Sequence, residues 1–151
     1  MSLKIIHTAD WHLGQTFFGY DRDEEHEALL SWLIDILTLR QTDVLLIAGD
    51  VFDVANPSAA AQRRFFRFLR EANRHNPQLQ IVIIAGNYDS AARLEAPIPL
   101  LAELNTSIVG VVPRTDLCKI DFDSLLIPLY NKEGKREAIC LAVPYLRQGD
   151  Y

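Results

Sequence analysis

The sequence has 151 residues, of which 49% are hydrophobic, and it carries a formal net charge of -5. This size suits one ordinary domain with a sizeable core, and the acidic balance argues against a protein that coats nucleic acid nonspecifically. An enzyme that acts on nucleic acid is not excluded, because bound metal cations can reverse the charge of a local site. The two cysteines, Cys118 and Cys140, form no close pair and are expected to be reduced thiols. We recognise no signal peptide or membrane span, and therefore expect a cytoplasmic protein with no membrane partner.

Three short apolar runs in the first ninety or so residues predict buried parallel strands. They cover Leu3–Ala9, Val44–Ala48 and Ile81–Ala85, and each ends abruptly in small or polar residues. Continuous apolar runs of this length are typical of central strands that are buried on both faces.

Helical patterns separate these runs. Leucines recur at helical spacing from Leu29 to Leu37, after a group of acids that favours a helix N-terminus. A second helix is expected to start at Asn56-Pro57, and a third, shorter one is expected between Ala91 and Leu104. The alternation of strands and helices predicts an α/β fold with a parallel sheet.

The pattern changes after about Thr106, where strand-like pieces follow one another without helices. We expect them to be antiparallel, as edge strands or as the start of a second sheet: Ser107–Val112, Leu117–Ile120, Ser124–Leu129 and Ala138–Val143. A turn at residues 132–135 separates the last two. We interpret residues 1–151 as the N-terminal portion of a single domain, whose remainder and any capping region are absent from the sequence.

Polar residues follow each of the three predicted buried strands. Asp10 and His12 come after the first, Asp50 after the second and Asn87 after the third. The carboxyl ends of parallel strands share one crevice, so we expect these side chains to lie close together. Mixed oxygen and imidazole ligands suit Mn²⁺, Fe²⁺ or Zn²⁺. Two such ions about 3.5–4 Å apart, bridged by Asp50, can clamp a phosphoryl group and generate a hydroxide.

These residues stand in motifs that resemble the calcineurin-like metallophosphoesterases. Residues 10–12 match the family's Asp-x-His motif, and residues 49–53 match its Gly-Asp-x-x-Asp motif. The third family motif is Gly-Asn-His-Asp, which reads Gly-Asn-Tyr-Asp at residues 86–89 here. Within the superfamily, residues 7–14, 48–53 and 143–146 resemble the SbcD-type nuclease subunits most closely.

The resemblance implies the first half of a layered αββα fold and a centre for two divalent metal ions, of which Mn²⁺ is the ion we expect. Asp10 and His12 would hold one ion, Asp50 would bridge both, and Asn87 would hold the second. Further histidine ligands, including a Gly-His-x-His motif, would follow residue 151, so this chain by itself is expected to bind metal poorly and to be weak or inactive.

Tyr88 occupies the position of a family histidine that assists the leaving group or the phosphate. A tyrosine hydroxyl can donate a hydrogen bond, but it is a poorer proton donor near neutrality than imidazolium. Tyr88 is therefore our candidate catalytic residue with two interpretations: it performs the same task less well, or the chemistry depends more on the metals.

The resemblance also implies a function. The protein would be a metal-dependent nuclease subunit that cleaves DNA phosphodiester bonds in repair, recombination or replication, acting with an SbcC-type, SMC-like ATPase. It would pair as a homodimer through residues 56–73 and Ala91–Leu104, with Phe66 near the contact and Ile98, Leu100, Leu101 and Leu104 adding apolar surface. Two alternatives stay open: another phosphodiesterase or phosphatase, and a non-catalytic subunit that binds DNA ends.

Other polar residues receive structural interpretations. His7 is expected in the core, whereas His26 and His75 are expected to be solvated. Asp53 and Asp89 are left open between ligands and supporting residues. A basic stripe on the second predicted helix is interpreted as a solvated face rather than a phosphate-binding surface: Arg63, Arg67, Arg70 and Arg74.

Overall fold

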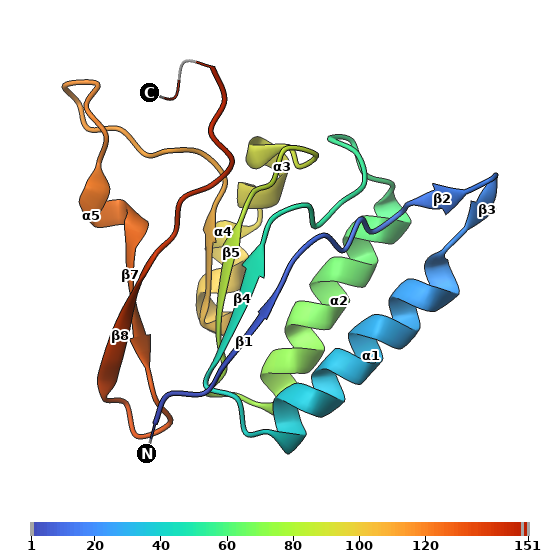
Figure 1. The fold of residues 1–151 in the computed structure, drawn as a ribbon, viewed down its shortest axis with the longest axis horizontal. Helices are drawn as coiled ribbons and strands as arrows, with labels where there is room; N and C mark the ends of the chain where they lie inside the picture. The colour runs from blue at the N-terminus through green and yellow to red at the C-terminus, as the bar shows by residue number, and fades with distance from the viewer. Residues whose placement is uncertain (1, 149, 151) are drawn as a thin grey trace.

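The structure is a computed structural model that describes residues 2–148 and 150, without the side chains of Leu100 and Ala102. It has three layers (Figure 1). The middle layer is a parallel sheet in the order β1-β4-β5-β6, formed by β1 (Ile5–Thr8), β4 (Val44–Ala48), β5 (Gln80–Ile84) and β6 (Thr106–Val109). Helices α1 (Asp23–Leu39) and α2 (Ala59–His75) cover one face, and the antiparallel pair β7 (Leu126–Tyr130) and β8 (Arg136–Leu141) covers the other. The predicted α/β fold with a parallel sheet is confirmed.

Side chains along β4 alternate between the two outer layers. Leu45 and Ile47 pack in the core shared with the helices, whereas Val44 packs with residues of the β7–β8 pair. Successive residues of a strand point to opposite faces, so a strand covered on both sides is apolar throughout. The predicted bounds Val44–Ala48 agree with β4 for this reason.

The first strand, β1, differs from this pattern because, within the part of the chain that the structure describes, it lies at the edge of the sheet and pairs only with β4. Its residues are exposed or half-buried, and Ile5 is exposed. His7 is exposed as well. The expectation that His7 lies in the core is therefore wrong, since it assumed a central strand.

Helix α1 buries one stripe of side chains against α2 and the sheet. His26 belongs to the same stripe as Leu30, Leu33 and Leu37, at helical spacing. Its exposed fraction is only 4%, so the expectation of a solvated His26 is wrong. His75, at the end of α2, is exposed as expected.

Helix α2 begins at Ala59, two residues after the predicted start. Ser58 caps it, because the Ser58 hydroxyl oxygen accepts a hydrogen bond from the Ala61 N–H at 3.1 Å. The predicted third helix is divided into α3 (Ala91–Glu95), α4 (Ile98–Leu101) and the 3-10 turn η1 (Ala102–Leu104). Pro97 stands between the first two pieces, and proline lacks the N–H that would continue a helix.

The region after Thr106 required three corrections. Strand β6 is parallel to β5 rather than antiparallel, because the pieces α3 to η1 provide the crossover that a parallel connection needs. Residues 117–119 form no strand, and Ile120 makes only an isolated bridge with Arg114. Residues 122–125 form a helical turn, α5 (Phe122–Leu125), which Asp121 caps, so the predicted strand at Ser124 starts at Leu126.

One element was missed. A short hairpin of β2 (Thr16–Phe17) and β3 (Tyr20–Asp21) connects β1 to α1 along the chain and projects away from the sheet (Figure 1). Two-residue strands leave too little periodicity to detect in a sequence. Across residues 2–148, none of the helices has the length and apolar character needed to span a lipid bilayer.

Candidate metal centre

Two loops at the carboxyl ends of β1 and β4 run side by side and are joined by backbone hydrogen bonds. The N–H of Asp10 donates to the Gly49 carbonyl at 3.1 Å, and the N–H of His12 donates to the Asp50 carbonyl at 3.0 Å. The N–H of Leu13 donates to the Val51 carbonyl at 2.9 Å. These bonds extend the parallel pairing beyond the strands and give the side chains a fixed backbone frame.

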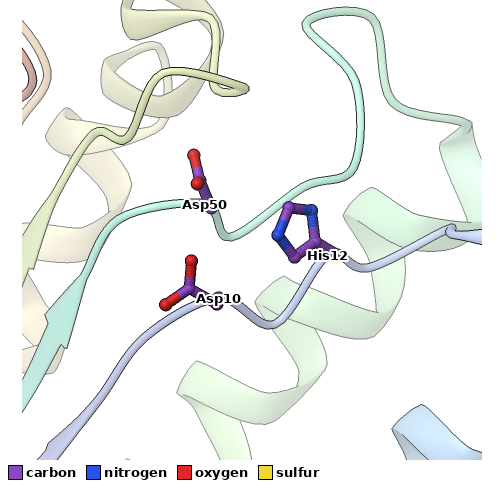
Figure 2. Close-up of side chains that lie close together, drawn as sticks. All are labelled: Asp10, His12 and Asp50. Carbon is purple, nitrogen blue, oxygen red and sulfur yellow. The ribbon is translucent and has the colours of Figure 1, made fainter.

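Asp10, His12 and Asp50 project from this frame toward one another (Figure 2). One potential ligand atom of each residue lies within 4.8 Å of those of the other two. Two donors bound at about 2.1 Å to the same ion can be no more than about 4.2 Å apart, so a closure of about half an ångström would place all three on one ion. The expected convergence of these three residues is confirmed, and two carboxylates with one imidazole form a donor set that suits a divalent transition metal.

All three clustered residues have left-handed backbone conformations. Their φ angles are +57° for Asp10, +47° for His12 and +49° for Asp50. Residues with a side chain adopt this region infrequently, and such conformations persist where the surrounding structure enforces them, often at functional sites. Here the backbone hydrogen bonds between the two loops hold the three residues in these conformations.

The loop after β5 approaches the cluster from the neighbouring strand. The N–H of Tyr88 donates to Asp50 Oδ1 at 3.0 Å, so this carboxylate is oriented by the third motif. The Tyr88 ring contacts the His12 ring edge to face, with 5.0 Å between centroids, and 48% of Tyr88 is exposed. Asn87 is adjacent to Tyr88 in this loop and is exposed, so its role as a ligand stays a prediction.

Asp89 has a supporting role. Only 1% of it is exposed, and its carboxylate accepts hydrogen bonds from three backbone N–H groups, those of Val51 (3.2 Å), Phe52 (3.0 Å) and Gly86 (2.9 Å). These bonds tie the β4 loop to the β5 loop. The Asp89 carboxylate is therefore occupied in joining these two loops. This arrangement does not favour the role of metal ligand that the sequence left open for Asp89.

Two residues near the site were not identified from the sequence. Gln15 Nε2 donates to Asp53 Oδ1 at 3.2 Å, and Arg147 Nη2 donates to the Asp89 carbonyl at 2.9 Å. The N–H of Tyr145 also donates to the Ala85 carbonyl at 2.8 Å, which brings the C-terminal segment to the end of β5. No sequence signal marks the contacts of Gln15 and Arg147, because they form between segments that are distant along the chain.

Three of the four arginines in the basic stripe of α2 form ion pairs with acids of α1 and α2. Arg67 pairs with Glu27, and Arg70 and Arg74 both lie 3.1 Å from Glu71 carboxylate oxygens. This arrangement agrees with the interpretation of a solvated helix face. Screening by water makes such exposed pairs weak contributors to stability.

A parallel α/β sheet that gathers two aspartates and a histidine at its carboxyl edge has the ligand set that a metal-dependent phosphoesterase requires. Comparison with known families agrees, because residues 3–139 match the Calcineurin-like phosphoesterase family and the chain belongs to it.

The chain is also similar to SbcD subunits of the nuclease SbcCD. It is 49% identical to that of Rhodobacter capsulatus over 148 residues, covering 98% of this chain and 36% of the relative. It is 38% identical to that of Escherichia coli K12 over 151 residues (98% and 34%) and 38% identical to that of Bacillus subtilis over 122 residues (81% and 31%). The resemblance to SbcD-type subunits is confirmed, and the chain spans about a third of the length of the curated relatives that it matches.

Proposed function

We propose that this protein is the nuclease subunit of an SbcCD-like complex and hydrolyses DNA phosphodiester bonds in DNA repair or recombination. The convergence of Asp10, His12 and Asp50 at the ends of β1 and β4 carries the proposal, since these three side chains could together hold a divalent metal ion. The similarity to SbcD subunits of the nuclease SbcCD supports the choice of DNA as substrate.

We propose two divalent ions, Mn²⁺ among the candidates, as the cofactors. Asp10 and His12 would hold one ion, Asp50 would contact both, and Asn87 would offer a neutral carbonyl oxygen to the second. When bound, a pair of ions would supply a nucleophilic hydroxide and stabilise the leaving oxygen. The chain contributes orientation: Asp50 is 9% exposed, and the Tyr88 N–H holds one of its carboxylate oxygens.

Tyr88 is proposed to contact the scissile phosphate or the leaving group. About half of its surface is open beside His12, so a bound phosphodiester can reach it. The hydroxyl would donate a hydrogen bond to an oxygen on which negative charge develops.

A nuclease assay tests the function and separates the alternatives. The full-length protein would be incubated with Mn²⁺ and double-stranded DNA, and in parallel with a small phosphodiester and a phosphomonoester. Cleavage of DNA supports the proposal. Hydrolysis of the small esters alone would favour another phosphoesterase, and DNA binding without any hydrolysis would favour a scaffold protein.

The proposed protein partner is an SbcC-type, SMC-like ATPase, in line with the name of the relatives, and the proposed compartment is the cytoplasm, where such a complex would meet DNA. Copurification of the full-length protein with the SbcC-type ATPase of the same organism tests this. Separate elution of the two proteins during gel filtration at micromolar concentration would contradict it.

A homodimer through α2 and the α3–η1 region is also proposed. Phe66 is half-buried, lies beside Arg63, Arg67 and Arg70, and Ile98 is 38% exposed. The apolar strip is smaller than expected, because Leu101 is buried and Leu104 packs against the core; the Leu100 side chain lies outside the described residues. Sedimentation of the full-length protein with and without Phe66→Glu tests the interface. A monomer at micromolar concentration would remove the dimer, and an undisturbed variant dimer would place the contact elsewhere.

A further inference from the structure

Asp53 lies against the nitrogen of His12 that faces the β4 loop. Asp53 Oδ1 is 3.2 Å from His12 Nδ1, and only 26% of the Asp53 side chain and 22% of the His12 side chain are exposed. His12 Nδ1 is buried, and within the described part of the chain it has no well-aligned hydrogen bond. A small rotation of either side chain would let the Nδ1–H donate to Asp53 and complete that bond.

Asp53 is itself held in place from two directions. Its backbone N–H donates to the Leu13 carbonyl at 3.3 Å, and its Oδ1 accepts a hydrogen bond from Gln15 Nε2 at 3.2 Å. The Gln15 side-chain oxygen in turn accepts from Arg22 Nη1 at 2.7 Å. The carboxylate is therefore restrained to a position next to His12 by residues on both sides of the β2–β3 hairpin.

Among the residues that the structure describes, the potential ligand atoms that lie close together belong to Asp10, His12 and Asp50, and Asp53 is not one of this group. A carboxylate next to one nitrogen of a metal-binding imidazole fixes the orientation and the tautomer of the ring and leaves the other nitrogen free to bind. We propose that Asp53 is a positioning residue for His12: it holds the Nδ1–H and directs Nε2 to the metal. This inference rests on the proposed metal centre.

Binding of Mn²⁺ to the full-length protein, measured by isothermal titration calorimetry, tests the inference without relying on activity. Asp53→Ala should weaken the affinity about 10- to 100-fold, the usual effect of removing a partner of a ligating histidine. Asp53→Asn keeps an oxygen that can accept the Nδ1–H bond, so its affinity should lie closer to the wild-type value than that of Asp53→Ala does. Asp35→Ala removes an exposed acid of α1 and should leave the affinity unchanged.

The control variant Asp50→Ala separates the two possible failures. If Asp50→Ala binds Mn²⁺ like the wild type, the metal centre itself is wrong. If Asp50→Ala loses binding while Asp53→Ala retains wild-type affinity, only the positioning role is overturned, and the same holds if Asp53→Asn is as weak as Asp53→Ala. Far-UV circular dichroism checks each fold, and the less disruptive Asp53→Ser replaces Asp53→Ala if the latter does not fold.

Discussion

Gly86 lies so close to Asp50 that a Cβ atom on Gly86 would stand 2.1 Å from Asp50 Oδ1 and 2.3 Å from the Asp50 backbone nitrogen. Gly49 makes a similar approach, since a Cβ there would stand 2.9 Å from the Gly86 Cα. The loops after β4 and β5 therefore meet backbone to backbone. Because Gly49 and Gly86 have no side chains, the two loops can approach closely and the Asp50 carboxylate can lie between them.

Gly86→Ala is predicted to push Asp50 out of the metal centre. The added methyl group meets backbone and carboxylate atoms rather than a flexible side chain, so the loops must separate, at a cost of about 1–3 kcal/mol in the free energy of unfolding. Urea unfolding and Mn²⁺ titration of the full-length protein measure both effects. Gly134→Ala is the control: its Cβ meets open space, and its φ of +75° alone costs about 1–2 kcal/mol without changing Mn²⁺ affinity. Wild-type Mn²⁺ binding by Gly86→Ala would contradict the close approach.

Asp50→Ala is predicted to cause the largest loss of nuclease activity among single ligand variants. Under the proposed mechanism Asp50 contacts both ions, whereas Asp10 contacts one. The rate of DNA cleavage in the full-length protein should fall by more than about 100-fold, the scale of losing one electrostatic stabiliser of a transition state. Asp10→Ala provides the comparison. Normal cleavage by Asp50→Ala would rule out the two-metal mechanism.

Tyr88→His is predicted to keep or raise the cleavage rate, because imidazole can donate a proton more readily near neutrality than a phenol. Tyr88→Phe keeps the ring that packs on His12 but removes the hydroxyl, and should lower the rate by about tenfold or more. Single-turnover cleavage with saturating Mn²⁺ measures the step of interest. If Tyr88→Phe cleaves as fast as the wild type and Tyr88→His brings no gain, the position is structural.

Arg64→Ala is predicted to destabilise the contact between α1 and α2. Arg64 is 7% exposed, its Nε donates to Glu27 Oε1 at 2.9 Å, and its Nη2 lies 2.8 Å from Asp23 Oδ2. Hydrogen bonds of this kind to charged groups contribute about 1.5–3 kcal/mol each, and the half-exposed acids can regain water, so a total loss of about 1–3 kcal/mol is expected in urea unfolding. The adjacent and exposed Arg63 supplies the control, since Arg63→Ala should change stability little.

The buried His26 is predicted to make the fold less stable as the pH falls from 7.5 to 5.5. Burial lowers the pKa of His26, with help from the nearby Arg64 and Arg22 and against the opposing effect of Asp23 and Glu25. Below the ordinary histidine pKa of about 6.5, the unfolded chain takes up a proton that the folded chain resists, so unfolding becomes more favourable.

Urea unfolding of the wild type, His26→Gln and His7→Gln at the two pH values measures this contribution. The pH dependence should shrink in His26→Gln and persist in His7→Gln, because His7 is exposed. Equal pH dependence in all three proteins would show that the burial of His26 does not control it.

The strand β4 was predicted with its correct bounds, whereas β1 was wrongly predicted to be a central strand. The two cases show what a local pattern of residues can determine. A strand covered on both faces must be apolar at every position, so Val44–Ala48 could be predicted directly with its bounds. The run that holds β1 looks the same, but β1 lies at the edge of the sheet. Edge or centre depends on strand order, which no local pattern encodes, and His7 was misplaced for that reason.

The sequence by itself determined the chemistry: which residue types stand after which strands, and hence Asp10, His12 and Asp50 as one cluster in a phosphoesterase of the calcineurin-like family. Only the tertiary structure decided how that cluster is supported. Asp53 and Asp89 are each the last residue of a motif, yet one faces His12 and the other ties two loops together. The direction in which a carboxylate points is set by contacts between segments far apart along the chain, and these contacts exist only once the sheet has brought the loops together.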